Sequence, residues 1–167
     1  MKVIKLNNSN DTEQDAVTGL YVYPGHLVRR LHQISVGMFH DMLSEFNITP
    51  VQFGLLYRLS EVDEIDQRTL GSQIGVNAAT ISDVTLRLEN RGLLTRKESE
   101  QDRRVKLLSI TAEGVDFVQT TIPPVKDMQG VLLEPLTPSE SEEFIRLASK
   151  IIDGNNNYSR APIVRNK

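Results

Sequence analysis

The sequence contains no cysteine, and aromatic residues make up only 5% of its 167 positions. The absence of cysteine excludes disulfide bonds, thiol nucleophiles and thiolate metal ligands. So few aromatic rings give little surface on which single-stranded bases could stack. No run of about 18 apolar residues is present to span a bilayer, and the polar N-terminus lacks the apolar core of a signal peptide. We therefore expect a soluble, cytoplasmic protein with no membrane partner.

Common signatures of catalysis are also missing from the sequence. We find no glycine-rich phosphate loop, no serine in a nucleophile elbow and no histidine–carboxylate arrangement on a strand-loop scaffold. We expect no enzymatic activity, no cofactor and no metal site. The length suits one domain with a fair core, or a small domain with helical extensions.

Positive charge is concentrated in one segment, although the chain as a whole is acidic. The net charge is −3, yet residues 87–106 hold seven basic residues against four acidic ones. This segment therefore carries +3, and the remainder carries −6. A basic strip on an acidic body can face the phosphates of DNA. The alternative is a solvated hairpin without a partner.

Residues 66–90 show the pattern of two helices joined by a tight turn. Leu70 and Ile74 follow a cap-like Asp66 and are spaced i,i+4, as one buried stripe requires. The chain then breaks at Gly75 and restarts as a second helix, predicted over residues 78–90. Its apolar positions share one face. The other face projects small and polar side chains suited to a major groove, namely Ala79, Thr80, Asp83 and Arg87.

A hairpin is predicted directly after the second helix. Gly92 can end that helix in a left-handed conformation, and two short strands follow, over residues 93–97 and 105–110. Between them lies a polar tip longer than a tight turn. The candidate DNA-binding residues of the whole hairpin are Arg96 in the first strand and Asp102, Arg103 and Arg104 in the tip.

Further helices are predicted on both sides of this segment. Residues 1–24 form a polar, mobile arm, and residues 26–46 form a helix whose apolar residues cover more than half of its circumference. Thr49 caps a helix that runs to about residue 59. A helix over residues 112–129 is kinked or split by Pro123 and Pro124, and Thr137 caps a last helix. The tail from residue 155 has no periodicity.

This order of elements resembles the MarR (multiple-antibiotic-resistance regulator) family of bacterial transcription factors over about residues 25–153. The motifs that carry the resemblance are Leu88-Glu89-Asn90-Arg91-Gly92-Leu93-Leu94, Asp102-Arg103-Arg104 and Leu108-Ser109-Ile110-Thr111-Ala112-Glu113-Gly114. The resemblance implies one mainly α domain with a small β-hairpin wing. In it, a winged helix-turn-helix lobe at residues 49–111 is flanked by N- and C-terminal dimerisation helices at residues 25–48 and 112–154. Residues 155–167 form a tail.

The resemblance also implies a homodimer that represses transcription from a pseudo-palindromic operator in double-stranded DNA. Asp102 should hold Arg104 while a wing arginine enters the minor groove. Whether that arginine is Arg103 or Arg104 stays open, and both could touch only phosphate. In the second helix, Thr80, Ser82 and Asp83 lie where side chains reach base edges.

Asp83 departs from the basic residue that many relatives carry at this place. Its carboxylate could accept a hydrogen bond from cytosine, or pair with Arg87 and orient it toward the DNA. A surface ion pair without a DNA role is the third interpretation.

The first long helix also indicates an effector site. A wheel at about 100° per residue places His32 and Ser35 inside the apolar arc and Arg29 at its edge. These groups could bind a carboxylate or phenol in an apolar pocket lined by Met38, Phe39, Phe53 and Tyr57. The helix is similar to that of relatives that respond to aromatic acids or their coenzyme A thioesters. Alternatively, His32 is a core or dimer-interface histidine.

Two other functions are alternatives to DNA-binding repression: zinc sensing and binding of an acidic protein. A zinc sensor would need clustered ligands, but His26, His32 and His40 form no i,i+4 pair on one helix. A winged-helix module that binds an acidic protein is the other alternative. Duplex-DNA affinity should fall steeply with salt for a DNA binder, whereas a flat response favours the protein partner.

Overall fold

The computed structural model describes residues 19–164. The chain divides into two compact units, residues 1–34 and 35–167. Most of the predicted mobile arm lies outside the described residues, and its described end forms the 3₁₀ helix η1 (Gly19–Val22). Among the described helices, none has the length and apolarity needed to cross a bilayer.

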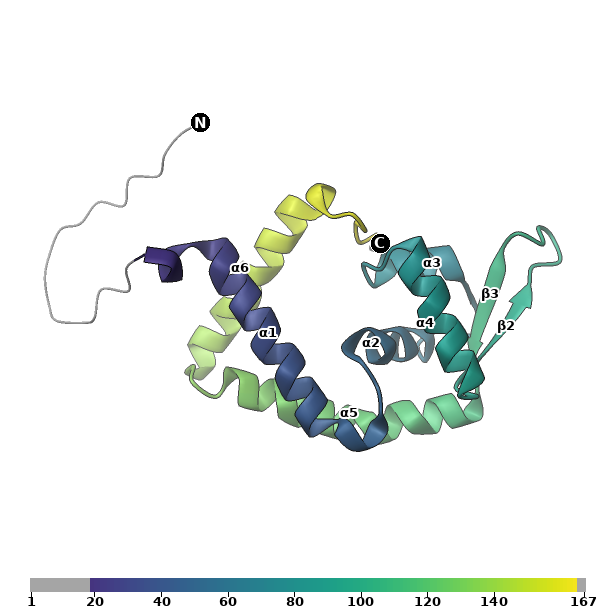
Figure 1. The fold of residues 1–167 in the computed structure, drawn as a ribbon, viewed down its shortest axis with the longest axis horizontal. Coiled ribbons are helices and arrows are strands. Elements are labelled where there is room, and N and C mark those ends of the chain that lie inside the picture. The colour runs from purple at the N-terminus through teal and green to yellow at the C-terminus, as the bar shows by residue number, and fades with distance from the viewer. Residues whose placement is uncertain (1–18, 165–167) are drawn as a thin grey trace, which may run out of the picture. The chain divides into compact units, whose positions relative to one another are not determined.

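Helices account for most of the described chain, as Figure 1 shows. The class predicted from the sequence, mainly α with a small β-hairpin wing, is confirmed. Helix α1 (Pro24–Met42) begins in the first unit and ends in the second. The elements that follow are η2 (Ser44–Phe46), α2 (Pro50–Leu59), β1 (Ile65–Asp66), α3 (Gln67–Gln73), α4 (Ala78–Asn90), β2 (Leu94–Glu98), β3 (Lys106–Ile110), α5 (Ala112–Leu133), α6 (Pro138–Asn155) and η3 (Asn156–Tyr158).

Polar caps fix the starts of the helices in the second unit. A side-chain oxygen at each cap accepts a hydrogen bond from a backbone N–H in the first turn, which otherwise has no partner. These caps are Thr49, Asp66, Asn77, Thr111 and Thr137. The boxes that the sequence indicates at Thr49 and Thr137 are both complete, because the third residue of each helix bonds back to the cap.

Three antiparallel strands form the sheet, in the order β1-β3-β2. The wing pairs Leu94 with Ile110 and Glu98 with Lys106, so each strand begins one residue later than predicted. Strand β1 pairs Ile65 with Leu108 and was not predicted. Two residues are too few to show an alternating pattern, and their pairing depends on β3.

The core of the second unit lies beneath the helix-turn-helix and the sheet. Most of its fully buried apolar side chains come from α2, α3, α4 and both wing strands, namely Leu55, Leu56, Leu59, Leu70, Ile81, Leu88, Leu94 and Leu108. Burial of this apolar surface is the main stabilising term of the fold. It also fixes how α4 is turned about its axis.

The structure corrects three predicted boundaries. The first long helix ends at Met42 rather than residue 46, because η2 follows it and Asn47 adopts a left-handed backbone with φ of 46°. Helix α5 is not split at Pro123 and Pro124 but continues to Leu133. The tail, predicted from residue 155, begins one residue later because α6 includes Asn155, and the tail forms η3 and contacts α3 through Val164.

The connection from α4 to α5 passes through a tightly packed joint. Gly92 has φ of +73°, and the following Leu93 N–H bonds to the Leu88 carbonyl at 3.1 Å, which ends α4 in a Schellman motif. The Thr111 hydroxyl donates to the Gly92 carbonyl at 2.7 Å. Gly114 lies so close to the Leu93 carbonyl oxygen that a Cβ there would collide with it.

Gly114→Ala should destabilise the protein by about 1–3 kcal/mol through overpacking of this joint. Gly130→Ala, on the same helix, is the matched control, because nothing lies within 4 Å of its added Cβ. We expect that control to stabilise by about 0.5–1 kcal/mol. Urea unfolding midpoints measure both changes, and equal effects would contradict the close contact.

Candidate nucleic-acid interface

Helix α4 turns one face to the core and the opposite face to solvent. Its buried residues are Ile81, Val84, Thr85 and Leu88. The hydroxyl of Thr85 is satisfied within the helix, where it donates to the Ile81 carbonyl at 2.9 Å. All residues of this helix predicted to reach DNA are exposed: Ala79, Thr80, Ser82, Asp83 and Arg87.

Asp83 and Arg87 form an ion pair on this exposed face. The Asp83 Oδ2 lies 3.0 Å from the Arg87 Nη2, and both side chains are more than half exposed. This pair is common to two of the three interpretations of Asp83: orientation of Arg87 toward the DNA, and a surface ion pair without a DNA role. It therefore does not decide between them.

The turn between α3 and α4 is held by close backbone contacts. Gly75 has φ of +69°, a conformation that costs glycine little. The Val76 N–H bonds to the Gly71 carbonyl at 2.8 Å, and a Cβ at Gly71 would lie 3.0 Å from the Val76 carbonyl oxygen. Glycine at both positions therefore permits the two helices to approach.

The wing tip is ordered by Asp102. Its Oδ1 accepts a hydrogen bond from the Arg104 backbone N–H at 3.0 Å, and its carbonyl accepts from Val105 at 2.8 Å. The Arg104 guanidinium is more distant, with Nε 3.8 Å from Asp102 Oδ1. Asp102 thus holds Arg104 mainly through the backbone and leaves its guanidinium 95% exposed.

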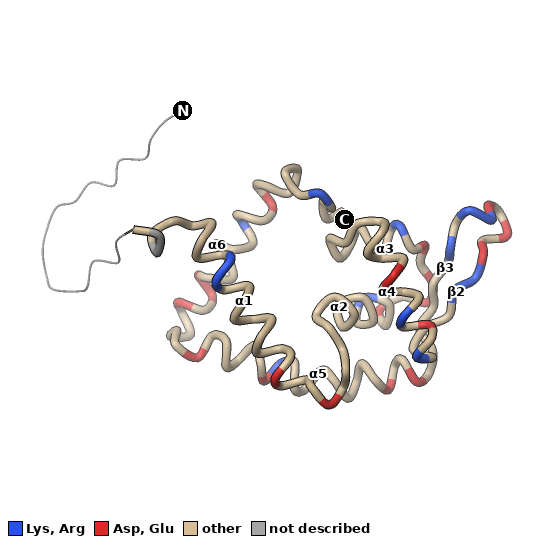
Figure 2. Tube along the Cα trace, viewed as in Figure 1, with Lys and Arg blue, Asp and Glu red and all other residues tan. Residues whose placement is uncertain are grey.

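Most cations nearer the base of the wing are paired with carboxylates. Lys106 lies 2.8 Å from Glu98 across the hairpin. The Glu64 carboxylate accepts a hydrogen bond from Lys97 at 2.6 Å and so raises the pKa of that ammonium. Figure 2 shows basic residues on both sides of the hairpin and acidic residues toward its tip.

Arg96 is the least exposed of the predicted DNA-binding arginines. Its Nη2 lies 2.7 Å from Glu89 Oε2 on α4, and its side chain is 23% exposed. The pair ties β2 to α4. Arg103 and Arg104 are therefore the cations that the wing presents outward, since the Arg103 guanidinium forms no ion pair within residues 19–164.

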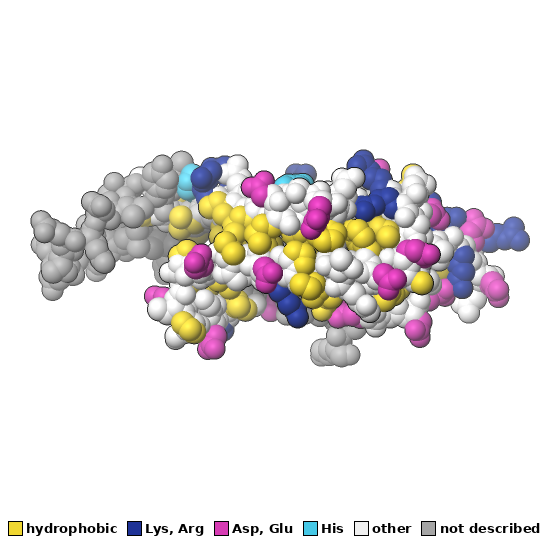
Figure 3. All heavy atoms as spheres, turned by 90° about the horizontal axis from the view of Figure 1, so that it is seen from below, with side chains coloured by type: hydrophobic (Ala, Val, Ile, Leu, Met, Phe, Trp, Pro, Cys, Tyr) yellow, Lys and Arg dark blue, Asp and Glu magenta, His cyan; other side chains and the backbone are white. Residues whose placement is uncertain are grey.

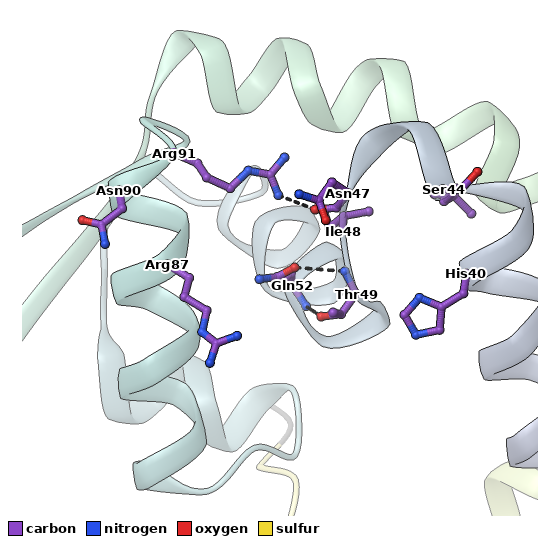
Figure 4. Close-up of a pocket in the computed structure, with 10 residues that line it drawn as sticks. His40, Ser44, Asn47, Ile48, Thr49, Gln52, Arg87, Asn90 and Arg91 are labelled. Atoms are coloured by element: carbon purple, nitrogen blue, oxygen red, sulfur yellow. Dashed lines mark hydrogen bonds between the residues drawn. The ribbon is translucent and has the colours of Figure 1, made fainter.

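A cavity of about 550 Å³ opens beside α4. Figure 4 shows Arg87 and Arg91 pointing from α4 toward the start of α2, with His40 on the opposite wall. No carboxylate is found among the described residues that line it. Arg87 is nevertheless paired with Asp83 of α4, so Arg91 is the arginine of this lining without a carboxylate partner within residues 19–164.

Arg91 has a structural role that the sequence did not reveal. It donates hydrogen bonds to the carbonyls of Asn47 at 2.7 Å and Phe46 at 3.1 Å, and its guanidinium lies 5.1 Å from the centre of the Phe117 ring. These contacts join α4, the segment before α2, and α5. They depend on partners 26 or more positions away, for which local sequence gives no signal.

The predicted effector residues fall into two groups. Arg29 and His32 belong to the first unit and are exposed, and Arg29 donates to the Gln33 side chain at 3.0 Å. In the second unit, ring centroids lie 6.3 Å apart for Phe39 and Phe53, and 5.9 Å apart for Phe53 and Tyr57. Ser35 and Met38 are half-buried. The cavity of Figure 4 is lined by other residues.

No metal-binding cluster is found in the part of the chain that the structure describes. No three His, Asp or Glu side chains within residues 19–164 are placed to hold one ion. The three histidines of α1 therefore do not form a metal site with described carboxylates.

Known proteins share both the sequence and this architecture. The family model described as MarR matches residues 48–106, which span α2 to the start of β3. The PcaV transcriptional regulator from Streptomyces coelicolor, solved in complex with its natural ligand, is 36% identical, with a TM-score of 0.77 over 83% of this chain and 97% of that one. The chain belongs to the MarR family.

Two further proteins are similar to this chain in structure or in sequence. The structure of BpsR from Bordetella bronchiseptica, whose DNA binding is regulated by 6-hydroxynicotinic acid, is 26% identical, with a TM-score of 0.77 over 81% of this chain and 97% of that one. The organic hydroperoxide resistance transcriptional regulator of Bacillus subtilis (strain 168) is 29% identical over 113 residues, covering 68% of this chain and 74% of the relative. The predicted family and its winged helix are thus confirmed, and these relatives are transcriptional regulators.

Glu89→Gln distinguishes a structural role of Arg96 from direct DNA contact. If Arg96 anchors the wing, loss of the charged partner should weaken DNA binding by about 1 kcal/mol, roughly fivefold. If Arg96 contacts phosphate, removing a nearby negative charge should strengthen binding instead. Fluorescence anisotropy with a duplex selected in vitro measures the change, with Glu134→Gln as the charge-matched control.

Proposed function

We propose that this MarR-family protein is a dimeric repressor that binds a pseudo-palindromic operator and is released by a small aromatic acid or its coenzyme A thioester. Helix α4 would read base edges in the major groove while the wing reaches the neighbouring minor groove. In the dimer, the two α4 helices would enter successive major grooves, about 34 Å apart.

The observation that carries the proposal is the exposure of two arginines at the wing tip: Arg103 forms no ion pair within residues 19–164, and Arg104 keeps a 95% exposed side chain although its Nε lies 3.8 Å from Asp102 Oδ1. Other basic side chains of the hairpin are paired with Glu64, Glu89 and Glu98. Arg103 and Arg104 face solvent beyond those pairs. A narrow minor groove, with its strong negative potential, is a partner suited to them.

Exposed apolar residues support a dimer. Helix α6 has no buried residue, yet its exposed side chains include Ile145, Leu147, Ile151 and Ile152. Figure 3, seen from the side where α5 runs, shows hydrophobic side chains gathered in a band. An apolar surface of this kind on a water-soluble chain needs a partner, and a second copy of the chain would cover it.

The relatives and the aromatic cluster favour an aromatic effector. PcaV was solved with its natural ligand, and BpsR responds to 6-hydroxynicotinic acid. Phe39, Phe53 and Tyr57 form a contiguous group of rings against which an aromatic ligand could pack. Arg29, with His32 and Ser35, would bind its carboxylate.

Arg104→Ala should weaken binding to the selected duplex and reduce the salt dependence. Each phosphate neutralised contributes close to one unit to the slope of log affinity against log salt. A dimer lacking two such contacts should therefore lose about two units. Anisotropy titrations at about 50 to 200 mM salt measure the slope, and thermal unfolding checks that the variant stays folded.

Lys126→Ala is the control for Arg104→Ala because Lys126 is exposed on α5 and forms no ion pair among the described residues. Its slope should match that of the wild type. An unchanged slope in Arg104→Ala would remove the wing role. A flat salt response of the wild-type protein would contradict DNA binding and favour a protein partner.

The effector should lower the affinity for the operator, and the operator should lower the affinity for the effector, by the same factor. Because coupling between sites is reciprocal, an aromatic acid found by thermal stabilisation must bind the free dimer more tightly than the operator-bound dimer. Calorimetric titration with and without the selected duplex gives both affinities. Equal affinities would contradict release by the effector.

A further inference from the structure

The C-terminal segment, residues 156–164, lies against the helix-turn-helix. The Val164 N–H donates to the Ser72 carbonyl of α3 at 3.0 Å. The Ile163 side chain packs on the turn, where a Cβ at Gly75 would lie 3.2 Å from Ile163 Cγ1. Figure 1 shows this end of the chain returning from α6 to α3.

Internal hydrogen bonds give this segment, which we call the C-terminal strap, a defined shape. The Asn156 side chain bonds to the backbone of Ile163 twice, donating to its carbonyl at 2.9 Å and accepting from its N–H at 2.8 Å. The Ser159 hydroxyl accepts from the Ala161 N–H at 3.1 Å. The strap is therefore closed into a loop before it reaches α3.

A cavity of about 580 Å³ lies between the strap and the helix-turn-helix. Its walls include Arg68 of α3, Arg160 of the strap, and Asn77 and Ala78 at the start of α4. Among the described residues that line it, no carboxylate is found. Neither arginine forms an ion pair within residues 19–164, so two cations share one cavity without compensation. An anion between them would relieve their repulsion.

We propose that Arg68 and Arg160 bind a backbone phosphate of the duplex that α4 reads, and that the strap serves to place Arg160. The inference rests on the proposed function. The cavity reaches Ala78, the first residue of α4, which is one to four residues from the exposed Ala79, Thr80 and Ser82. Phosphate contacts beside a recognition helix fix its register on the duplex, and arginine suits phosphate because its donors form a planar fork.

The strap also explains how a residue so far along the chain would join the DNA-binding lobe. Arg160 lies beyond the end of α6, whereas Arg68 lies in α3. The bonds from Asn156 to Ile163 and from Val164 to Ser72 bracket Arg160 on both sides. Without them, holding Arg160 near α4 would cost the entropy of ordering a free tail.

The test uses full-length variants and the duplex selected with the wild-type chain. Arg160→Ala should lower the salt slope by about one unit per subunit, whereas Arg160→Lys, which keeps the charge, should retain it. Asn156→Ala should also lower the slope, although it changes no charge, because the strap is released. Lys126→Ala, which removes the same charge elsewhere, should leave the slope unchanged.

Three results would overturn the inference. The first is a slope for Arg160→Ala equal to that for Lys126→Ala. The second is tighter DNA binding by Arg160→Ala and Asn156→Ala, which would mean that the strap competes with DNA. Stabilisation by inorganic phosphate that depends on Arg160, with an unchanged DNA slope, would assign the cavity to a free anion. In each of these cases the wild-type protein would still bind DNA, so the proposed function would be unaffected. If the wild-type protein did not bind DNA, the proposed function would be overturned as well.

Discussion

The buried face of α4 is the constraint on which the interface depends. Ile81, Val84 and Leu88 pack into the core, so the helix cannot rotate without exposing them, at roughly 1.5–3 kcal/mol for each side chain. The buried side chains therefore hold α4 in the orientation that directs Thr80, Ser82 and Asp83 toward solvent. The joint at Gly92 and Gly114 then fixes where the wing begins relative to this helix.

Carboxylates on neighbouring elements pair with the cations at the base of the wing. Glu89 on α4 holds Arg96, and Glu64 before β1 holds Lys97, so both cations stiffen the base of the wing. Asp102 orders the tip through the backbone and leaves the Arg104 guanidinium extended into solvent. An acidic protein thus presents positive charge at a small, rigid projection, which is where long-range attraction to DNA is most useful.

Local signals in the sequence predicted much of this fold, and long-range pairing accounts for what they missed. Caps such as Thr49 and Asp66, and the apolar stripe of residues 78–90, act within one or two helical turns and could be recognised directly. Strand β1, the bond from Arg91 to Asn47 and the contact of the strap with α3 depend on partners distant in the chain. The sequence predicts a kink or a split of this helix at Pro123 and Pro124, but α5 continues through both prolines to Leu133. The predicted site residues on α4 are exposed, as their periodicity indicates, whereas the contacts of Arg91 and the position of Arg160 follow only from the folded chain.

Hydroxyl-radical footprinting of the selected duplex tests the central claim most directly. Two copies of the α4 and wing unit should protect two windows whose centres are one helical turn apart, about 34 Å, each flanked by protection of the minor groove where Arg103 and Arg104 reach. A single protected window, or protection that stays unchanged when the wing arginines are replaced, would contradict the account.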